Sequence, residues 1–270
     1  MPAGTRPAEL FSQMKTPFYT MAQRGLLALL LAATAGTCAA AEPVLDLRRW
    51  SEDFSDPARF AKDWAPYGFL AEGIDAKHPL GKSVSGAQSR PEWWQLVEGA
   101  LRAQNFKEEK HPAGITHKVA GRDIRMRCRI KLPAGGMAQI TIRGDNPIVE
   151  RNFHVAVFRL QTQSVSAADN DVIHPKDSPE AQAMKARGEW NRKFFIPKTE
   201  KREVAPDVWH EVIVEMRGLE MTAFVDGEKA LTYKTLCGDV EKTSIGLAGG
   251  SSKTADQMTF FDDIRFEPLE

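Results

Sequence analysis

The feature that most constrains this fold is a pair of aromatic, strand-like segments near the two ends of the chain. The first covers residues 50–54 and the second covers residues 260–266. Short alternating segments bounded by turn residues lie between them. If the two terminal segments pair with each other, neither leaves a long strand edge bare. The sequence therefore predicts an antiparallel β-sandwich whose first and last strands are neighbours.

The N-terminal region predicts a secretory signal peptide over residues 1–41, with cleavage after Ala41. Residues 25–36 are apolar, Arg24 precedes them, and small residues follow at 38–41. The apolar run is shorter than the roughly 20 residues that a membrane span needs. We therefore expect a secreted protein, periplasmic or extracellular, whose translation starts at Met1, Met14 or Met21. The alternative is a buried N-terminal helix.

The charge and cysteine content of the expected mature chain argue against several functions. The leader carries three bases and one acid, so 33 of 36 basic and 35 of 36 acidic residues remain. Balanced charge gives no overall field to attract nucleic acid or an anionic membrane. Cys128 and Cys237 could pair in an oxidising compartment or remain as buried thiols. This content fits neither a disulfide scaffold nor a four-ligand zinc site.

Alternation of side-chain types predicts most of the strands. Residues 123–131 alternate between apolar and basic, and residues 137–143 between apolar and polar. We expect the apolar members to face a core: Ile124, Met126, Cys128, Ile130, Ala138, Ile140 and Ile142. Further strands are expected at 153–163, 209–217 and 221–225, the last followed by an Asp226-Gly227 turn. Helices are expected at 57–62 and at 178–187, where Ser178 can cap.

Residues 164–203 interrupt the strand pattern. They are polar, charged and proline-bearing, with a few apolar residues such as Trp190. A stretch of this length without periodicity inside a compact domain is usually functional or disordered. We therefore expect one domain over residues 42–270 that carries a long loop insertion at 164–203.

A family resemblance rests on residues spread over nearly the whole mature chain. These are Asp53, Phe54, Trp64, the 94–101 segment, Arg143, the 206–215 strand with Trp209, the 225–227 turn, and residues 245–247 and 261–264. The pattern resembles the concanavalin A-like lectin/glucanase superfamily, and within it the 3-keto-disaccharide hydrolase-type domains of secreted bacterial proteins. The resemblance implies an all-β, two-sheet antiparallel jelly-roll sandwich with Trp209 in its core. It also implies a carbohydrate site that includes Arg143.

The chain departs from that family at two places. Residues 134–139 replace an Asn-Ser-Gly-Ile stretch, and His154 and Ala156 replace a Glu-x-Gln pair. A carboxylate that could act as an acid or a base is therefore missing where the family pattern places one. This difference leaves open a binding function without catalysis.

A row of arginines offers two interpretations. Arg125, Arg127 and Arg129 share one face of a strand at a spacing of about 6.6 Å, and Lys131 extends the row. On a ligand-binding face they would form a ladder of guanidinium groups suited to sulfate or carboxylate groups of a polysaccharide. The alternative is a solvated face paired across strands with Glu211 and Glu215.

Arg143 and His154 are the candidate catalytic residues. If Val155 and Val157 point into the core, His154 points to the opposite face and can act as a general base. The alternative for His154 is a hydrogen-bonded structural histidine. The candidate substrate-binding residues are Arg159, Gln139, Gln161, Trp190, Asp145 and Asn146.

Carboxylates give a weaker signal for ordinary glycosidase chemistry or for a metal. Glu211 and Glu215 lie about 13 Å apart on one strand, whereas glycosidase carboxyl pairs lie roughly 5–9.5 Å apart. Asp169 and Asp171, with Asn170 between them, could bind calcium, or they could belong to a plain loop. Trp190 could stack on a sugar or simply anchor its loop to the sandwich.

These patterns together predict a secreted carbohydrate-active protein. As an enzyme it would cleave 3-keto-glycosides by hydrolysis or elimination, with His154 as the base and Arg143 stabilising the enolate. The alternatives are a non-catalytic module that binds an anionic polysaccharide and a cell-surface scaffold domain.

Overall fold

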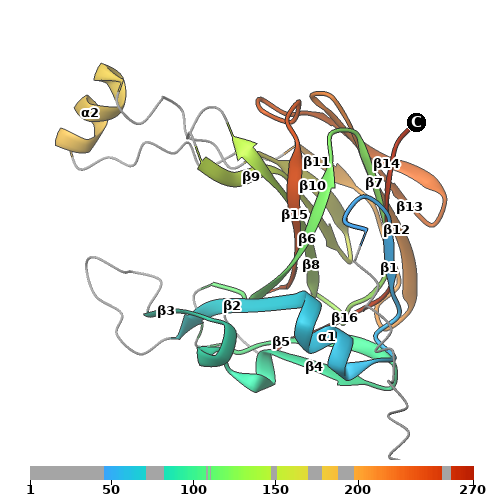
Figure 1. Ribbon diagram of the computed structural model, residues 1–270. Coiled ribbons are helices and arrows are strands. Elements are labelled where there is room, and N and C mark those ends of the chain that lie inside the picture. The colour runs from blue at the N-terminus through green and yellow to red at the C-terminus, as the bar shows by residue number, and fades with distance from the viewer. Residues whose placement is uncertain are drawn as a thin grey trace, which may run out of the picture. The chain divides into compact units, whose positions relative to one another are not determined.

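Two antiparallel sheets form the described part of the computed structural model (Figure 1). The structure describes residues 46–70, 82–107, 109, 111–146, 151–169, 178–187, 198–250 and 257–270. The predicted signal peptide, Trp190 and Asp171 lie outside these ranges. Within them, no helix is both long and apolar enough to cross a membrane.

The first sheet has eight strands: β1 (Trp50–Glu52), β4 (Trp94–Val97), β5 (Ala100–Asn105), β7 (Ile124–Lys131), β12 (Trp209–Arg217), β13 (Glu220–Val225), β14 (Glu228–Lys234) and β16 (Gln257–Pro268). Their order is β14-β13-β12-β7-β16-β5-β4, and β1 also pairs with β16. Trp50 lies opposite Phe266 and Glu52 opposite Ile264. The predicted pairing of the two terminal segments is thus confirmed.

The second sheet also has eight strands: β2 (Trp64–Leu70), β3 (Lys82–Ser85), β6 (Gly114–Gly121), β8 (Met137–Asn146), β9 (Arg151–Gln161), β10 (Ser164–Ala168), β11 (Lys198–Lys201) and β15 (Lys242–Gly249). Their order is β11-β10-β9-β8-β15-β6-β2-β3. Strands β8 to β11 are consecutive in the chain, whereas β15 lies between β8 and β6, so this sheet brings together residues from distant parts of the sequence.

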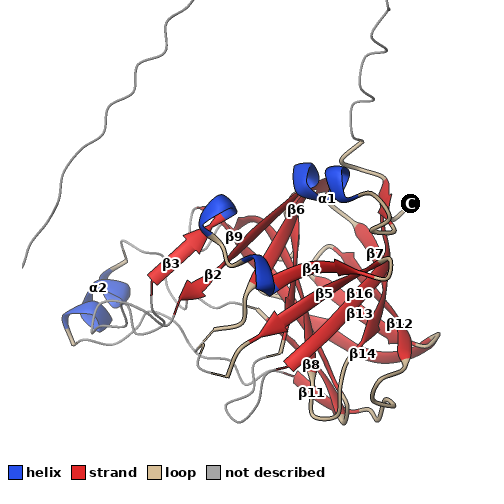
Figure 2. Ribbon diagram, turned by 90° about the horizontal axis from the view of Figure 1, so that it is seen from below, coloured by secondary structure: helices blue, strands red, loops and turns tan. Residues whose placement is uncertain are grey.

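Helices are short and few in the described part, as Figure 2 shows. They are α1 (Pro57–Asp63) and α2 (Pro179–Ala186), with single 3₁₀ turns at Gly86–Gln88 and Pro91–Trp93. The carboxylate of Asp56 accepts hydrogen bonds from the first turn of α1, and the Ser178 hydroxyl accepts one from the Ala181 N–H. Both predicted helices are confirmed.

The core lies between the two sheets and takes one face of each. The alternating apolar residues predicted for β7 and β8 are all buried in it, from Ile124 to Ile142. Cys128 and Cys237 are buried and form no disulfide with each other, and burial raises the pKa of Cys128. His117 also belongs to the interior, where its ring stacks on Trp50 with 4.0 Å between centroids.

The resemblance was wrong about Trp209. This side chain lies opposite Lys131 on the outer face of the first sheet and is partly exposed. The next residue, His210, is buried instead, with Nδ1 2.7 Å from Asp226 and Nε2 2.9 Å from the Ala205 carbonyl. Because β12 begins at Trp209 and faces alternate, Val212 and Val214 take the core positions of that strand.

The expectation of one long loop at 164–203 was wrong at both ends of that segment. Strand β10 pairs with β9 directly after a turn at residues 162–163, and β11 pairs with β10. The β10 sequence Ser-Val-Ser-Ala-Ala consists mainly of small residues, so it carries little intrinsic strand preference. Pairing with β9, a tertiary contact, decides its conformation.

Candidate functional site on the outer face of the second sheet

The arginines of β7 are neutralised on the outer face of the first sheet. Arg125 lies 2.7 Å from Glu215 and 3.2 Å from Glu267, and Arg127 lies 3.5 Å from Glu211. Arg129 lies 3.1 Å from Asp263 and 3.6 Å from Asp262. The solvated, cross-strand-paired interpretation of this row is confirmed.

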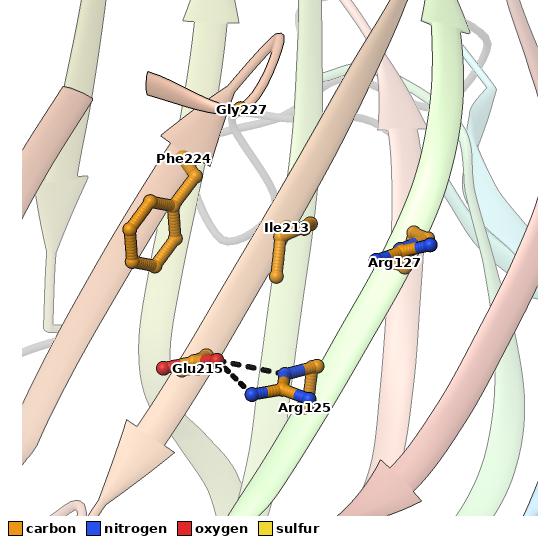
Figure 3. A pocket seen from close by; sticks show the side chains of 6 residues that line it. All are labelled: Arg125, Arg127, Ile213, Glu215, Phe224 and Gly227. Carbon is orange, nitrogen blue, oxygen red and sulfur yellow. Dashed lines mark hydrogen bonds and ion pairs between the residues drawn. The ribbon is translucent and has the colours of Figure 1, made fainter. Parts of the chain in front are cut away.

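A depression of about 260 Å³ on this face shows the same pairing (Figure 3). It is lined by Arg125, Arg127, Ile213, Glu215, Phe224 and Gly227. In Figure 3 the carboxylate of Glu215 meets the guanidinium of Arg125 inside the lining. Its bases already bind carboxylates of this chain, so the depression offers little to an anionic ligand.

Arg143 and His154 lie directly opposite each other on neighbouring strands of the second sheet. Opposed residues of an antiparallel pair share a face, with Cβ atoms about 4.5–5.5 Å apart. Arg143 alternates with the core residue Ile142, so both side chains belong to the outer face. The rings of His154 and Phe153 stack with 5.0 Å between centroids. The structure therefore brings the two candidate catalytic residues together.

A β-bulge makes this juxtaposition possible. The register of β9 against β8 shifts between Ile142 and Arg143, so Val155 has no partner of its own. Val155 and Ala156 are both buried in the core cluster. Val157 is also buried, but it lies outside that cluster, opposite Thr141 on the other face. The expectation that both valines face the core was wrong for Val157, and the bulge restores His154 to the outer face.

Arg143 is held by an aromatic phenol and not by an acid. Its Nη2 donates to the Tyr67 hydroxyl at 3.3 Å, and its guanidinium lies 5.3 Å from the centre of the Tyr67 ring. Its Nε is buried without a hydrogen-bond partner. Among the described residues no carboxylate pairs with Arg143. Since no described acid neutralises Arg143, its guanidinium can donate hydrogen bonds to an anionic or carbonyl oxygen of a ligand.

Small residues allow Tyr67 to reach Arg143 across the sheet. Tyr67 lies opposite Gly114, where a Cβ atom would come within 2.3 Å of the phenol ring. Strand β15, between β6 and β8, presents Gly246 and Ala248 on the same face. The Tyr67 ring therefore occupies space above β6 and β15 that larger side chains at these positions would fill.

His111 is a second histidine near Arg143. Burial lowers the pKa of His111, its hydrogen bond to the Pro112 carbonyl at 2.7 Å opposes this, and the charge of Arg143 lowers it further. His111 is therefore kept neutral at neutral pH. It lies before β6 in a segment without periodicity, so sequence analysis missed it; Tyr67 was missed because it follows Pro66 in a strand with no alternating pattern.

Arg159 and Gln139 form a second polar group on the same face. They lie opposite each other, and Arg159 Nε donates to Gln139 Oε1 at 2.8 Å. Gln139 Nε2 donates in turn to Thr141 at 3.0 Å. Burial alone lowers the pKa of Arg159, and no described carboxylate pairs with it. Gln139 and Arg143 are four residues apart on β8, or about 13 Å along the strand.

The other predicted site residues are scattered or undescribed. Gln161 is exposed at the end of β9 and accepts a hydrogen bond from Ser164. Asp145 is exposed and, with the backbone of Asn146, lies at the end of β8. Trp190 lies outside the described residues.

The calcium prediction gains no support from Asp169. Its Oδ2 accepts a hydrogen bond from the Leu236 N–H at 2.7 Å, and the residue is buried. Asn170 and Asp171 lie outside the described residues. Within the described ranges no three His, Cys, Asp or Glu side chains gather in a way that could hold a metal ion.

Paired terminal strands and two facing antiparallel sheets define a jelly-roll sandwich. Solved structures with this fold are similar to the chain over about four-fifths of its length. The laminarinase catalytic domain from Thermotoga maritima has a TM-score of 0.52 at 16% identity, covering 82% of this chain and 98% of that one. Alginate lyase AlyC3 has a TM-score of 0.53 at 8% identity, covering 81% and 96%.

A sialidase also matches, with a TM-score of 0.50 and 9% identity over 84% of this chain, although the match spans only 19% of the sialidase. No protein-family model and no curated protein sequence matches the chain. The similarities establish the jelly-roll fold, which is consistent with the concanavalin A-like superfamily that the sequence resembles. The 3-keto-disaccharide hydrolase type is not confirmed.

Proposed function

We propose that this protein is an exported carbohydrate-active enzyme that cleaves a glycosidic bond by elimination, beginning at a C–H group next to a carbonyl. The observation that carries the proposal is the bulge-dependent pairing of Arg143 with His154, in which no carboxylate among the described residues pairs with Arg143. Solved jelly-roll structures that include a laminarinase and an alginate lyase support a role in carbohydrate chemistry.

His154 serves as the base and Arg143 as the electrophilic support. His154 removes the proton from the carbon next to the carbonyl, and the electron pair of that C–H bond forms a C=C bond. The carbonyl oxygen becomes an enolate oxygen, which Arg143 stabilises by donating hydrogen bonds. As the enolate collapses, the carbonyl re-forms and a C=C bond forms between the deprotonated carbon and the next carbon. The glycosidic oxygen leaves that next carbon with its bonding electrons and takes up the proton that His154 had removed. Tyr67 acts as a positioning residue, because it holds the guanidinium from beneath.

A 3-keto-glycoside is the substrate that the sequence resemblance favours. Its C3 ketone acidifies the C2–H, and the glycosidic oxygen on C1 is the leaving group. Both bonds lie next to each other, so one base and one oxygen-binding group are sufficient. This chemistry needs no second carboxylate, which agrees with the replacement of the family's Glu-x-Gln pair.

A uronate polysaccharide is the second candidate substrate, and Arg159 favours it. There the carboxylate at C6 acidifies the C5–H and the oxygen on C4 leaves. The guanidinium of Arg159 is partly buried, lies about 13 Å along the sheet from Arg143 and pairs with no described carboxylate, so it can bind the carboxylate of a neighbouring sugar. One of the similar structures is alginate lyase AlyC3 in complex with dimannuronate.

The test is turnover of a 3-keto-disaccharide and of alginate by the wild-type protein and by His154→Ala. We expect an unsaturated product that absorbs in the ultraviolet, with a summed product mass equal to that of the substrate. His154→Ala should abolish product while binding persists. Products that gain one water without a double bond would contradict elimination. Retention of a glycan with no product would establish a binding module, and undiminished turnover by His154→Ala would reject the assigned base.

A further inference from the structure

A second surface of the described structure combines aromatic rings with bases that lack acid partners. It lies on the outer face of the first sheet, beyond the ion-paired arginines of β7. Strand registers place five side chains in one row across β12, β7, β16, β5 and β4: Trp209, Lys131, Phe260, Arg102 and Gln95. At about 4.8 Å per strand the row is about 19 Å long. We call it the aromatic–basic row.

The bases in this row bind rings and an amide. Lys131 Nζ lies 4.5 Å from the centre of the Phe260 ring and 5.2 Å from that of Trp209. Arg102 donates to Gln95 through Nη2, and its Nε is buried without a partner. All five side chains keep part of their surface exposed.

The neighbouring rows on the same face behave differently. One step along β7, Arg129 pairs with Asp262 and Asp263, and further on Arg125 pairs with Glu215. Within the described ranges neither Lys131 nor Arg102 has such a carboxylate. Within the same ranges Arg265, an exposed residue opposite Arg127, has no such carboxylate either, so the aromatic–basic row differs from the rest of this face in combining bases that lack an acid with aromatic rings.

We propose that the aromatic–basic row binds an acidic polysaccharide, at a site on the opposite side of the sandwich from Arg143. The apolar face of a pyranose ring packs on an aromatic ring. Phe260 and Trp209 are both partly exposed beside Lys131. Arg129 also lies 4.9 Å from the centre of the Trp209 ring, so Phe260 is the main stacking surface of the row. The carboxylate or sulfate of the same polymer pairs with Lys131 and Arg102. The extended row suits a chain molecule because it offers alternating ring and charge contacts along about 19 Å.

The experiment measures equilibrium binding of alginate to the full chain with Arg143→Gln and Arg159→Gln, so that the outer face of the second sheet does not contribute. We expect this form to bind alginate, more weakly as NaCl rises, and to bind neutral dextran far less. Adding Lys131→Gln and Arg102→Gln should raise Kd at least tenfold, because two charge-assisted contacts are lost. Adding Arg125→Gln and Arg127→Gln instead removes the same charge from the same face and should change Kd less than twofold.

Two further variants protect the test against misfolding. Arg102 is partly buried, so Lys131→Gln alone, checked by its melting temperature, should still raise Kd severalfold. Phe260→Leu should weaken binding while keeping its salt dependence, because it removes the ring and not a charge. Equal Kd values for the row variants and the Arg125/Arg127 control would overturn the proposal, as would equal binding of dextran. Absence of alginate binding by the Arg143→Gln/Arg159→Gln protein, in which the row is intact, would also overturn it. That result would not bear on the proposed function, which is tested separately by turnover of the wild-type protein.

Discussion

The two outer faces of the sandwich carry arginines in opposite electrostatic states. On the first sheet, Arg125 lies 2.7 Å from the carboxylate of Glu215 and the row of β7 is neutralised. On the second sheet, the polar partner of Arg143 is the neutral hydroxyl of Tyr67 at 3.3 Å. The regular arginine row is the more conspicuous sequence feature, yet its charges are satisfied within the fold. The comparison teaches that the partners of a base, and not its periodicity, indicate whether it is available to a ligand.

The largest expected effect is on kcat/KM, when one arginine is removed from each outer face in turn. Arg143→Gln should lower kcat/KM by about 100-fold or more, because a donor to the developing enolate is lost. Arg127→Gln removes the same charge from the other face and should leave kcat/KM within about twofold, since its partner is Glu211. Initial rates of unsaturated product formation measure both. Equal losses of kcat/KM in the two variants would show that the two faces do not differ in their role in catalysis.

A smaller effect is expected from moving Tyr67. Gly114→Ala places a Cβ atom 2.3 Å from the phenol ring, so the ring must shift away from Arg143. We expect kcat/KM to fall about tenfold, in line with the loss of a positioned group. Gly246→Ala is the matched control on the same face, because its nearest neighbour would be 3.5 Å away, an ordinary contact. If both alanine variants keep wild-type rates, Tyr67 does not position Arg143.

Stability should change in opposite directions on the two faces. Arg125→Met leaves Glu215 and Glu267 without their base and should lower the free energy of unfolding by about 1 kcal/mol or less. Arg159→Met replaces a partly buried charge that pairs with no carboxylate in the described part of the chain, and should raise that free energy by up to about 1 kcal/mol. Urea titration at constant ionic strength measures both. A loss of stability in Arg159→Met comparable to that of Arg125→Met would show that Arg159 is a structural residue.

The smallest expected effect is a shift in the titration of His111. Burial and Arg143 lower its pKa below the ordinary 6.5, so the unfolded chain binds more protons than the folded one in the window just below 6.5. The free energy of unfolding should therefore decrease as pH falls through that window. Arg143→Gln should raise the pKa of His111, as followed by NMR of its ring protons, and reduce this decrease. Arg127→Gln should leave the titration of His111 in place.

Parts of the fold were predictable because their causes are local. The alternation in β7 and β8 identifies the core face without reference to any other strand, since successive strand residues point to opposite sides. The Asp226-Gly227 turn forms as expected, with φ of +52° and +79°, values that suit a tight hairpin turn. Strands β10 and β11 were not predicted, because their small or charged residues show no alternation of apolar and polar side chains.

For the candidate site, the sequence predicted which residues take part but not the backbone geometry that brings them together. Arg143, His154, Arg159 and Gln139 were identified from the sequence, and the structure places them on one face. The reason given for His154 was right for Val155 but wrong for Val157, because strict alternation from Ala156 and Phe158 would send His154 to the core. A one-residue bulge at Val155 reverses its face, and bulges depend on the partner strand.

The sequence by itself determined the strand-rich pattern and the core-facing residues of β7 and β8, because period-two patterning and turn chemistry are local properties. Only the tertiary structure decided which bases are neutralised. Arg125 meets Glu215 across 90 residues of chain, and Arg143 meets Tyr67 across 76. Charge pairing at such separations follows from strand order and register, which arise from the packing of the whole core.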